Sequence, residues 1–90
     1  MRVDLFLRVS GLLRTRTLAG RACDGGFVSV NGRTAKPSTE VRPGDRISLV
    51  LPDGSPTELT VDSLPAGRSV ARRDRHKLYT AAAGGPERDG

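Results

Sequence analysis

The chain has 90 residues, and 15 Lys and Arg residues against 10 Asp and Glu residues give it a net charge of +5. A chain of this length forms one small domain, which excludes a Rossmann fold, a TIM barrel or a catalytic domain with an appended binding module. No apolar run approaches the about 20 residues of a membrane span, and the first residues lack the apolar region of a signal peptide. The single cysteine, Cys23, excludes an internal disulfide. We therefore expect a soluble protein of the cytoplasm with no membrane association.

Two features of the composition bear on the partner. Thirteen of the 15 basic residues are arginines, whose planar guanidinium grips a phosphate with two hydrogen bonds; the bias suits nucleic acid, although GC-rich coding produces it too. The aromatic residues are only Phe6, Phe27 and Tyr79. Domains that read single strands stack the bases on an aromatic platform, and this chain has none to offer. We expect recognition to rest on phosphates and shape.

Two short helices are predicted at the start of the chain. In residues 2–13, one buried face is defined by side chains that recur at helical spacing: Val3, Phe6, Leu7, Ser10 and Leu13. Gly11 ends or kinks this helix, because glycine costs about 1 kcal/mol relative to alanine inside a helix. Thr15 is placed to cap a second helix, which Gly25-Gly26 terminates. The buried stripe of that helix consists of Leu18, Ala19, Ala22 and Cys23.

After the second helix the apolar spacing changes to the period of two that is typical of strands. Asn31-Gly32 between alternating valines predicts a type I′ hairpin turn, with residues 33–35 as the returning strand. Further turns are predicted at residues 43–45 and 52–54. The inward residues are Val28, Val30, Val41, Ile47, Leu49, Leu51, Leu59, Val61 and Leu64. This order predicts a small α+β domain, with two N-terminal helices packed on a small antiparallel sheet.

A break at residues 65–67 divides the chain into a domain of residues 1–64 and a short basic C-terminal extension of residues 65–90. Within the extension, residues 70–79 are predicted to form a short helix anchored by the apolar side chains at its end. The alanines and glycines that follow are expected to be disordered.

Charge is segregated along the chain. Residues 1–21 contain five basic residues against one acidic residue, residues 65–79 again five against one, and residues 47–64 three acidic residues and no basic one. Arg14 and Arg16 flank the start of the second helix, where backbone N–H groups and the helix dipole favour an anion. A solvated helix face is the alternative. Because arginines at a helix N-terminus disfavour the helix itself, we interpret them as phosphate-binding residues.

The ordered motifs of the chain resemble those of the S4 RNA-binding domain family. That family runs R-[LV]-D-x-x-L, then Ser-Arg or Thr-Arg opening the second helix, then G-x-V-x-V-N-G. The matching segments are Arg2-Val3-Asp4 with Leu7, Thr15-Arg16, Gly26 through Gly32, Lys36-Pro37-Ser38 and Pro43-Gly44-Asp45. Each fragment alone is weak, but the set in this order and spacing, over residues 2 to about 51, is specific. Two residues depart from it: Cys23 replaces an aliphatic residue, and Phe27 stands where a polar residue is common and is expected to be partly exposed.

Within the family, the chain is similar to the free-standing short bacterial form of the heat-shock protein 15 and RqcP type. The resemblance implies an S4 (αL-motif) fold and an RNA-binding protein of the large (50S) ribosomal subunit in ribosome-associated quality control. It further implies contacts with 23S rRNA and with the peptidyl-tRNA of stalled nascent-chain complexes. The extension is shorter than in the heat-shock protein 15 type, which favours the RqcP-like interpretation. A ribosome-recycling factor like heat-shock protein 15 is the alternative.

Carried over position by position, the resemblance implies an RNA-binding face made of Arg2, Asp4, Arg8, Arg14, Thr15, Arg16 and Lys36. Arg16 is the strongest candidate, because it occupies the motif's arginine at the start of the second helix. Asp4 is expected to orient Arg8 or a neighbouring arginine, or to cap the first helix. A secondary set in the extension, expected to add electrostatic affinity with little specificity, is Arg72, Arg73, Arg75 and Lys77.

Two other classes of function are alternatives to RNA binding. A β-grasp sulfur carrier shares the turns at 31–32 and 43–45, and Gly84-Gly85 resembles its tail, but that tail must be the free C-terminus and the two N-terminal helices do not fit. Catalysis is not indicated, because His76 is the only histidine and has no Asp or Cys partner at a suitable spacing. One Cys and one His cannot build a metal site. We expect a monomeric protein that is not an enzyme, with no metal, cofactor or small-molecule substrate.

Overall fold

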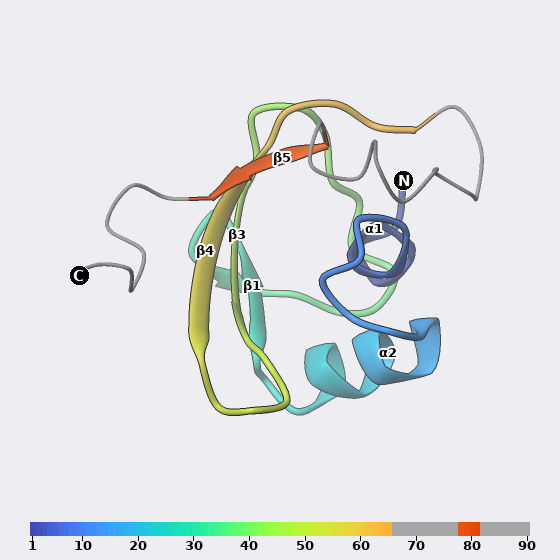
Figure 1. The fold of residues 1–90 in the computed structure, drawn as a ribbon, viewed down its shortest axis with the longest axis vertical. Helices are drawn as coiled ribbons and strands as arrows, with labels where there is room; N and C mark the ends of the chain where they lie inside the picture. The colour runs from blue at the N-terminus through green and yellow to red at the C-terminus, as the bar shows by residue number, and fades with distance from the viewer. Residues whose placement is uncertain (66–77, 82–90) are drawn as a thin grey trace.

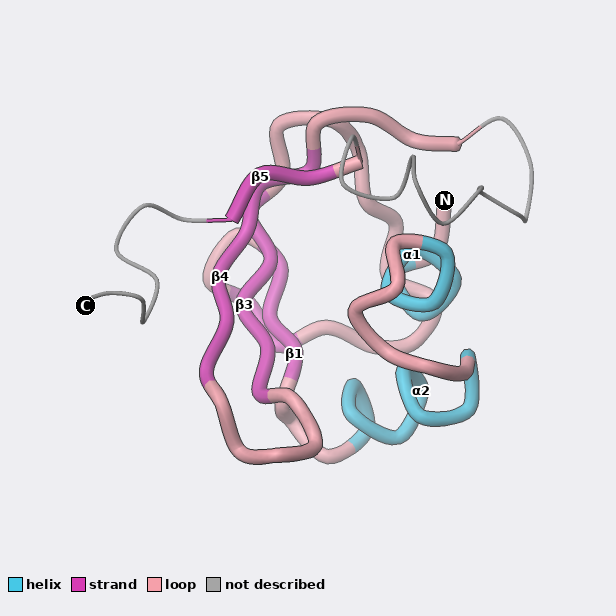
Figure 2. Tube along the Cα trace, viewed as in Figure 1, coloured by secondary structure: helices cyan, strands magenta, loops and turns pink. Residues whose placement is uncertain are grey.

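The structure is a computed structural model that describes residues 1–65 and 78–81. The elements of this part of the chain are α1 (Val3–Val9), α2 (Arg16–Asp24), β1 (Val28–Val30), β2 (Arg33–Thr34), β3 (Arg46–Val50), β4 (Pro56–Val61) and β5 (Tyr79–Ala81). Both helices lie on the same side of the sheet, so the molecule has two layers with the core between them (Figure 1). In Figure 2 the helices occupy one half of the molecule and the strands the other. The predicted α+β class is confirmed.

The first helix turns its predicted face into the core. All five residues of that face are buried: Val3, Phe6, Leu7, Ser10 and Leu13. Ser10 ends the helix as its C-cap, and its hydroxyl donates a hydrogen bond to the carbonyl of Leu7 at 3.2 Å. Gly11 follows at φ +82°, a conformation that residues with a Cβ rarely adopt. The helix therefore ends before the glycine, as predicted.

The second helix begins at the predicted cap. Thr15 has an extended backbone, and its side-chain oxygen accepts the N–H of Leu18 at 3.0 Å, which satisfies one of the first-turn donors that a helix leaves without a partner. Gly25 is the C-cap. Ala19 and Cys23 are buried in the core and Ala22 packs against it, whereas Leu18 is half-buried outside the core cluster, so the predicted stripe faces the core at three of its four positions.

Cys23 behaves as a small apolar side chain. It is 3% exposed, and its burial raises the pKa of the thiol to about 11, with the negative charges of Asp4 and Asp24 adding to the effect. The thiol is therefore protonated at neutral pH and a poor nucleophile. Burial of a thiol at this position agrees with the expectation that it replaces an aliphatic residue.

The sheet is antiparallel throughout, with strand order β2-β1-β3-β4-β5. Val30 lies opposite Ile47, and Ile47 lies opposite Leu59, so these residues form one row across three strands. Val28 and Leu49 pair in the next inward row. Because side chains alternate between the faces of a strand, this register places the buried residues of β1, β3 and β4 against the helices.

The hairpin between β1 and β2 turns at Asn31 and Gly32, as predicted. Their φ values are +52° and +83°, and a type I′ turn requires positive values at both central residues. The Asn31 side chain also accepts the N–H of Arg46 at 3.0 Å and donates to Asp45 Oδ1 at 3.1 Å. The turn residue therefore fixes the start of β3 as well as the hairpin.

The last described segment corrects two expectations about the extension. The predicted helix over residues 70–79 is wrong at its end, because Tyr79 begins β5, where it pairs with Val61. The expected disorder beyond the helix is wrong at Ala81, which pairs with Leu59. The first physical reason is that the free edge of β4 offers a row of unpaired N–H and C=O groups to another strand. The second is that a three-residue strand is too short to show a recognisable apolar period in the sequence. Residues 66–77 and 82–90 lie outside the described residues, and the boundary after residue 64 stays a prediction.

Leu78 provides a test of whether β5 belongs to the folding unit. It is 5% exposed in the hydrophobic core, so Leu78→Ala is expected to lower the free energy of unfolding by about 2–5 kcal/mol. Urea denaturation followed by circular dichroism measures this change. Thr34→Ala, at an exposed position of β2, is the control and should have little effect. An unchanged free energy for Leu78→Ala would mean that the extension folds apart from the domain.

Candidate nucleic-acid interface

The start of α1 is tied to the loop before β3. The N–H of Val3 donates to the carbonyl of Thr39 at 2.7 Å, and the N–H of Val41 donates to the carbonyl of Met1 at 2.9 Å. Lys36 begins the same loop, and its N–H donates to the Thr39 hydroxyl at 2.8 Å. Backbone pairing therefore brings three segments together: the N-terminus, the first turn of α1 and the loop that carries Lys36.

Asp4 is the centre of this arrangement. Its side chain is 6% exposed, and its Oδ2 accepts hydrogen bonds from Arg2 Nη2 and Arg16 Nε, each at 3.2 Å. Its Oδ1 accepts the N–H of Leu5 at 2.7 Å. One buried carboxylate therefore holds two guanidinium groups, one from the N-cap of α1 and one from the first turn of α2, and satisfies a donor of the first turn of α1. Arg16 uses its Nε for Asp4, so its two terminal NH₂ groups are not engaged by that carboxylate.

Both expectations for Asp4 are met in part. It orients arginines, and the partners are Arg2 and Arg16, where the sequence pointed first to Arg8. It also accepts a first-turn N–H, although the N-cap position itself is occupied by Arg2. Arg16 lies twelve residues further along the chain, so helical spacing did not indicate this pair.

The start of α2 lies next to the arginine pair. Thr15 accepts the N–H of Leu18, while helix geometry leaves the N–H groups of Arg16 and Thr17 without acceptors inside the helix. The first turn contains no acidic residue that would compensate the positive end of the dipole. Arg14 precedes the cap and is exposed. The backbone and the side chains together favour an anion at this end of the helix.

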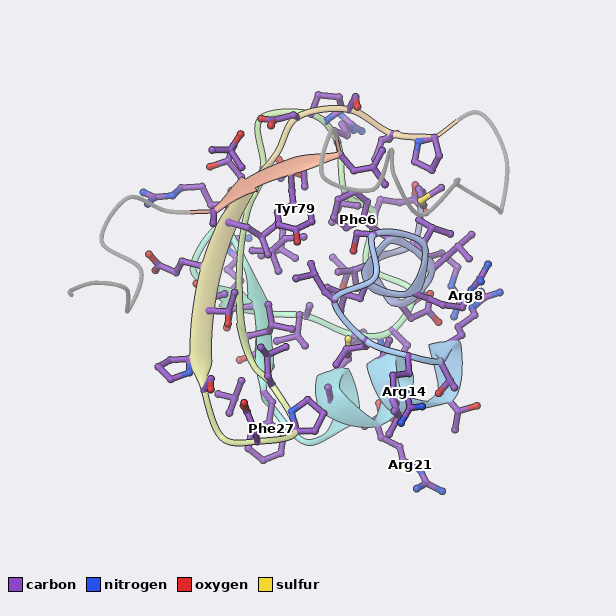
Figure 3. The ribbon with its side chains drawn as sticks, viewed as in Figure 1. Phe6, Arg8, Arg14, Arg21, Phe27 and Tyr79 are labelled. Carbon is purple, nitrogen blue, oxygen red and sulfur yellow. The ribbon has the colours of Figure 1, made fainter. Side chains whose placement is uncertain are left out.

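The remaining candidates lie on the same side of the molecule or in the loop beside it. Lys36 is exposed and Arg8, in the last turn of α1, is half-buried. Figure 3 shows Arg8, Arg14 and Arg21 on the helical side, pointing away from the sheet. Arg21 was not among the predicted residues, yet it is exposed in the last turn of α2. The sequence signal that could have identified Arg21 is its position on the same helix as Arg16. The secondary set Arg72, Arg73, Arg75 and Lys77 lies outside the described residues.

A cluster of acidic residues lies on the other layer. Asp53, Glu58 and Asp62 are exposed in the turn before β4, on the strand and directly after it, and Glu58 pairs with Arg46 at 3.9 Å. The two layers therefore differ in net charge: residues 1–24 contain five arginines against two acidic residues, whereas the described residues from 25 onward contain four basic residues against five acidic ones. A polyanion that approaches such a molecule is attracted to the helical side.

Two structural features are absent from residues 1–65 and 78–81. In this part of the chain, no three His, Cys, Asp or Glu side chains come close enough together to hold a metal ion. The same residues contain no helix with the length and apolar character needed to cross a membrane.

A small α+β domain with arginines held by a buried carboxylate beside a helix N-terminus has the features of a phosphate-binding, nucleic-acid-recognition domain. The family model of the S4 domain matches residues 1–47. The chain belongs to the S4 domain family, which confirms the resemblance seen in the motifs, and not to the β-grasp alternative.

Relatives of known name and structure agree with this membership. Over 81 residues the chain is 46% identical to the RQC P-site tRNA stabilizing factor of Helicobacter pylori (strain J99), covering 90% of this chain and 94% of the relative. The Bacillus subtilis factor of the same name is 49% identical over 49 residues, covering 54% of this chain and 57% of the relative. The trimeric heat shock protein 15 of Vibrio cholerae matches with a TM-score of 0.82 and 29% identity, covering 94% and 84% of the two chains. The solution structure of hypothetical protein HP1423 matches with a TM-score of 0.78 and 41% identity, covering 92% and 98%.

Substituting Asp4 separates positioning from simple charge. Asp4→Asn removes a negative charge, so electrostatics alone predicts tighter RNA binding. If the carboxylate positions Arg2 and Arg16, we expect RNA affinity to fall several-fold, with a loss of about 1–2 kcal/mol in the free energy of unfolding. Fluorescence anisotropy with an RNA hairpin measures the affinity. Asp24→Asn, an equal charge change at an exposed position of α2, is the control and should bind at least as tightly as the wild type. Tighter binding by Asp4→Asn would contradict the positioning role.

Proposed function

We propose that this protein binds structured RNA through its helical side and acts on the large ribosomal subunit in ribosome-associated quality control, as a P-site tRNA stabilizing factor. The observation that carries the proposal is the pair of arginines held by buried Asp4 beside the start of α2. The name shared by relatives at 46% and 49% identity supports the assignment of the RNA and the process.

The RNA-binding residues of this proposal are Arg2, Arg8, Arg14, Thr15, Arg16 and Lys36, with Asp4 as the residue that positions two of them. Arginine binds a phosphate through two parallel charge-assisted hydrogen bonds, which fixes orientation as well as adding affinity. Arginine side chains fixed by a carboxylate lose less rotational freedom on binding than unpaired ones. The contacts are expected with phosphates and 2′-hydroxyls, the groups that A-form RNA displays.

The finer parts of the proposal concern location and chemistry. The RNA partners are 23S rRNA and the peptidyl-tRNA of a stalled complex, and the protein acts in the cytoplasm as a monomer. It works by binding and not by catalysis, because a factor that stabilises a tRNA needs only contacts that persist. Salt dependence is the expected mark of such contacts, since each neutralised phosphate releases counterions.

A ribosome-recycling role like that of heat-shock protein 15 is the second candidate, supported by the TM-score of 0.82 with the Vibrio cholerae protein. The 46% identity to a tRNA stabilizing factor, against 29% for that neighbour, favours the first candidate. Pelleting the protein with large subunits that do or do not carry a P-site tRNA distinguishes them. Stronger association with the tRNA-carrying subunits supports stabilisation of the tRNA, and equal association contradicts it.

The assignment of Arg16 is tested by Arg16→Ala. Loss of one phosphate contact is expected to weaken binding to an RNA hairpin about tenfold and to reduce the slope of log affinity against log salt by about 1. Anisotropy titrations at several salt concentrations measure both quantities. The control is Arg33→Ala, which makes the same change in charge at an exposed position of β2. An Arg16→Ala protein with the affinity and slope of Arg33→Ala would rule out the phosphate contact.

The secondary set in the extension needs a substitution in place of a truncation, because removing everything after residue 67 also removes Leu78 and β5. Replacing Arg72, Arg73, Arg75 and Lys77 with glutamine retains the strand and removes four charges. We expect a lower salt slope and a loss of affinity of similar size for RNAs of different sequence. Unchanged slopes would exclude these side chains from the interface.

A further inference from the structure

A groove opens at the C-terminal end of α2, where the helix faces the turn between β3 and β4. It has a volume of about 400 Å³, and its walls are mostly apolar, with Leu18, Phe27, Val50 and Leu51 among them and Arg21 as the one charged residue. Phe27 is 54% exposed and Val50 38% exposed, the two large apolar side chains of the described residues that face solvent most. Figure 3 shows Phe27 beside the β3–β4 turn. The family alone does not account for an exposed aromatic ring here.

The Phe27 ring is held in place by the backbone at the end of α2. A Cβ added to Gly25 would come within 2.8 and 2.9 Å of two ring carbons, so the ring packs directly over the glycine. Any larger residue at position 25 would displace it. Contact with Gly25 restricts the ring on that side, and a ring with fewer accessible rotamers loses less entropy when a base stacks on it.

We propose that this groove binds one unpaired nucleobase of the bound RNA, stacked on Phe27, with the phosphate of that nucleotide on Arg21. The inference rests on the proposed function, because the base belongs to the RNA that the arginine face (Arg2, Arg8, Arg14 and Arg16) is proposed to hold. Aromatic rings stack on any base, since each base presents a π face. The open groove leaves the polar edge of the base in water, so the apolar walls need supply no hydrogen bonds to it.

Continuity with the arginine face favours this occupant. Arg21 lines the groove and lies on the same helix as Arg16, and the side chains of Arg14 and Arg21 both project from the helical side (Figure 3). A strand that follows these arginines along α2 brings a phosphate to Arg21 and its base to the groove. The charge beside the groove suits the backbone of RNA, and the apolar walls suit the faces of a base.

A protein partner fits the groove less well. A stable protein interface buries about 1,200–2,000 Å² in total, whereas this groove has room for one planar heterocycle or a few side chains. A base that enters it needs no further area, because the phosphate contacts of the arginine face supply the remaining affinity. One ring cannot form the platform that the composition excluded, but it is sufficient for a single base.

The test compares two RNA hairpins, one with unpaired purines in its loop and one with the same backbone but an abasic loop. The full-length wild type is compared with Phe27→Leu, which keeps an apolar side chain without a π face, and with Phe27→Trp, which keeps one. We expect Phe27→Leu to bind the purine hairpin about tenfold more weakly and the abasic hairpin as tightly as the wild type does. Phe27→Trp should bind both hairpins at least as tightly, and the salt slope should be the same for all three proteins.

Methyl NMR spectra of the wild type give an independent readout. A base in the groove shifts the Val50 and Leu51 methyl signals upfield by its ring current, which an abasic loop cannot do.

Equal binding by Phe27→Leu and wild type to the purine hairpin, or the same loss on both hairpins, would overturn the proposal. Methyl shifts with RNA-free ribosomal proteins but not with RNA would also overturn it and assign the groove to a protein. If Arg16→Ala weakens RNA binding while the Phe27 variants do not, the groove is wrong and the proposed function stands; if neither does, both fail.

Discussion

The buried carboxylate of Asp4 is the interaction on which the rest of this surface depends. A charge that is 6% exposed must be paired and hydrogen-bonded, because an uncompensated charge in the interior is strongly destabilising. Here the partners are a backbone N–H and two guanidinium groups whose side chains are 45% and 39% exposed. Satisfying the interior charge therefore fixes two cations at the surface. The stability of the fold and the geometry of the proposed RNA-binding face follow from the same contacts.

The strand side of the molecule helps to position this face but does not supply the two arginines that Asp4 holds. Val3 and Val41 take part in backbone hydrogen bonds that join the loop before β3 to the first helix and to the N-terminus, and both residues are completely buried in the core. The loop is thus held from both sides, which sets the position of Lys36. The helical layer has a net positive charge and the strand layer does not, so the two layers differ in charge. A molecule of this kind is oriented in the field of a polyanion before contact is made.

Sequence periodicity predicted the elements whose signals are local: the buried face of α1, the Thr15 cap and the Asn31-Gly32 turn. What it missed depends on contacts between distant segments. The Arg16 partner of Asp4 lies twelve residues away, β5 forms by pairing with β4, which is distant from it in the sequence, and the groove joins α2 to the β3–β4 turn. The motif set supplied the missing long-range information for the arginine face. It could not do so for Phe27, because that residue departs from the pattern.

The two ends of α2 offer different recognition chemistry, and the difference matters at the salt concentration of a cell. The proposed phosphate contacts at Arg14 and Arg16 would gain affinity by counterion release, so they would weaken as salt rises. Stacking on an apolar ring does not depend on charge and therefore retains its contribution under the same conditions. One stacked base supplies a larger share of the total RNA affinity in a small domain with few phosphate contacts than in a large domain with many. The exposed ring at the C-terminal end of α2 thus complements the arginines at its N-terminal end where electrostatic binding alone is weakest.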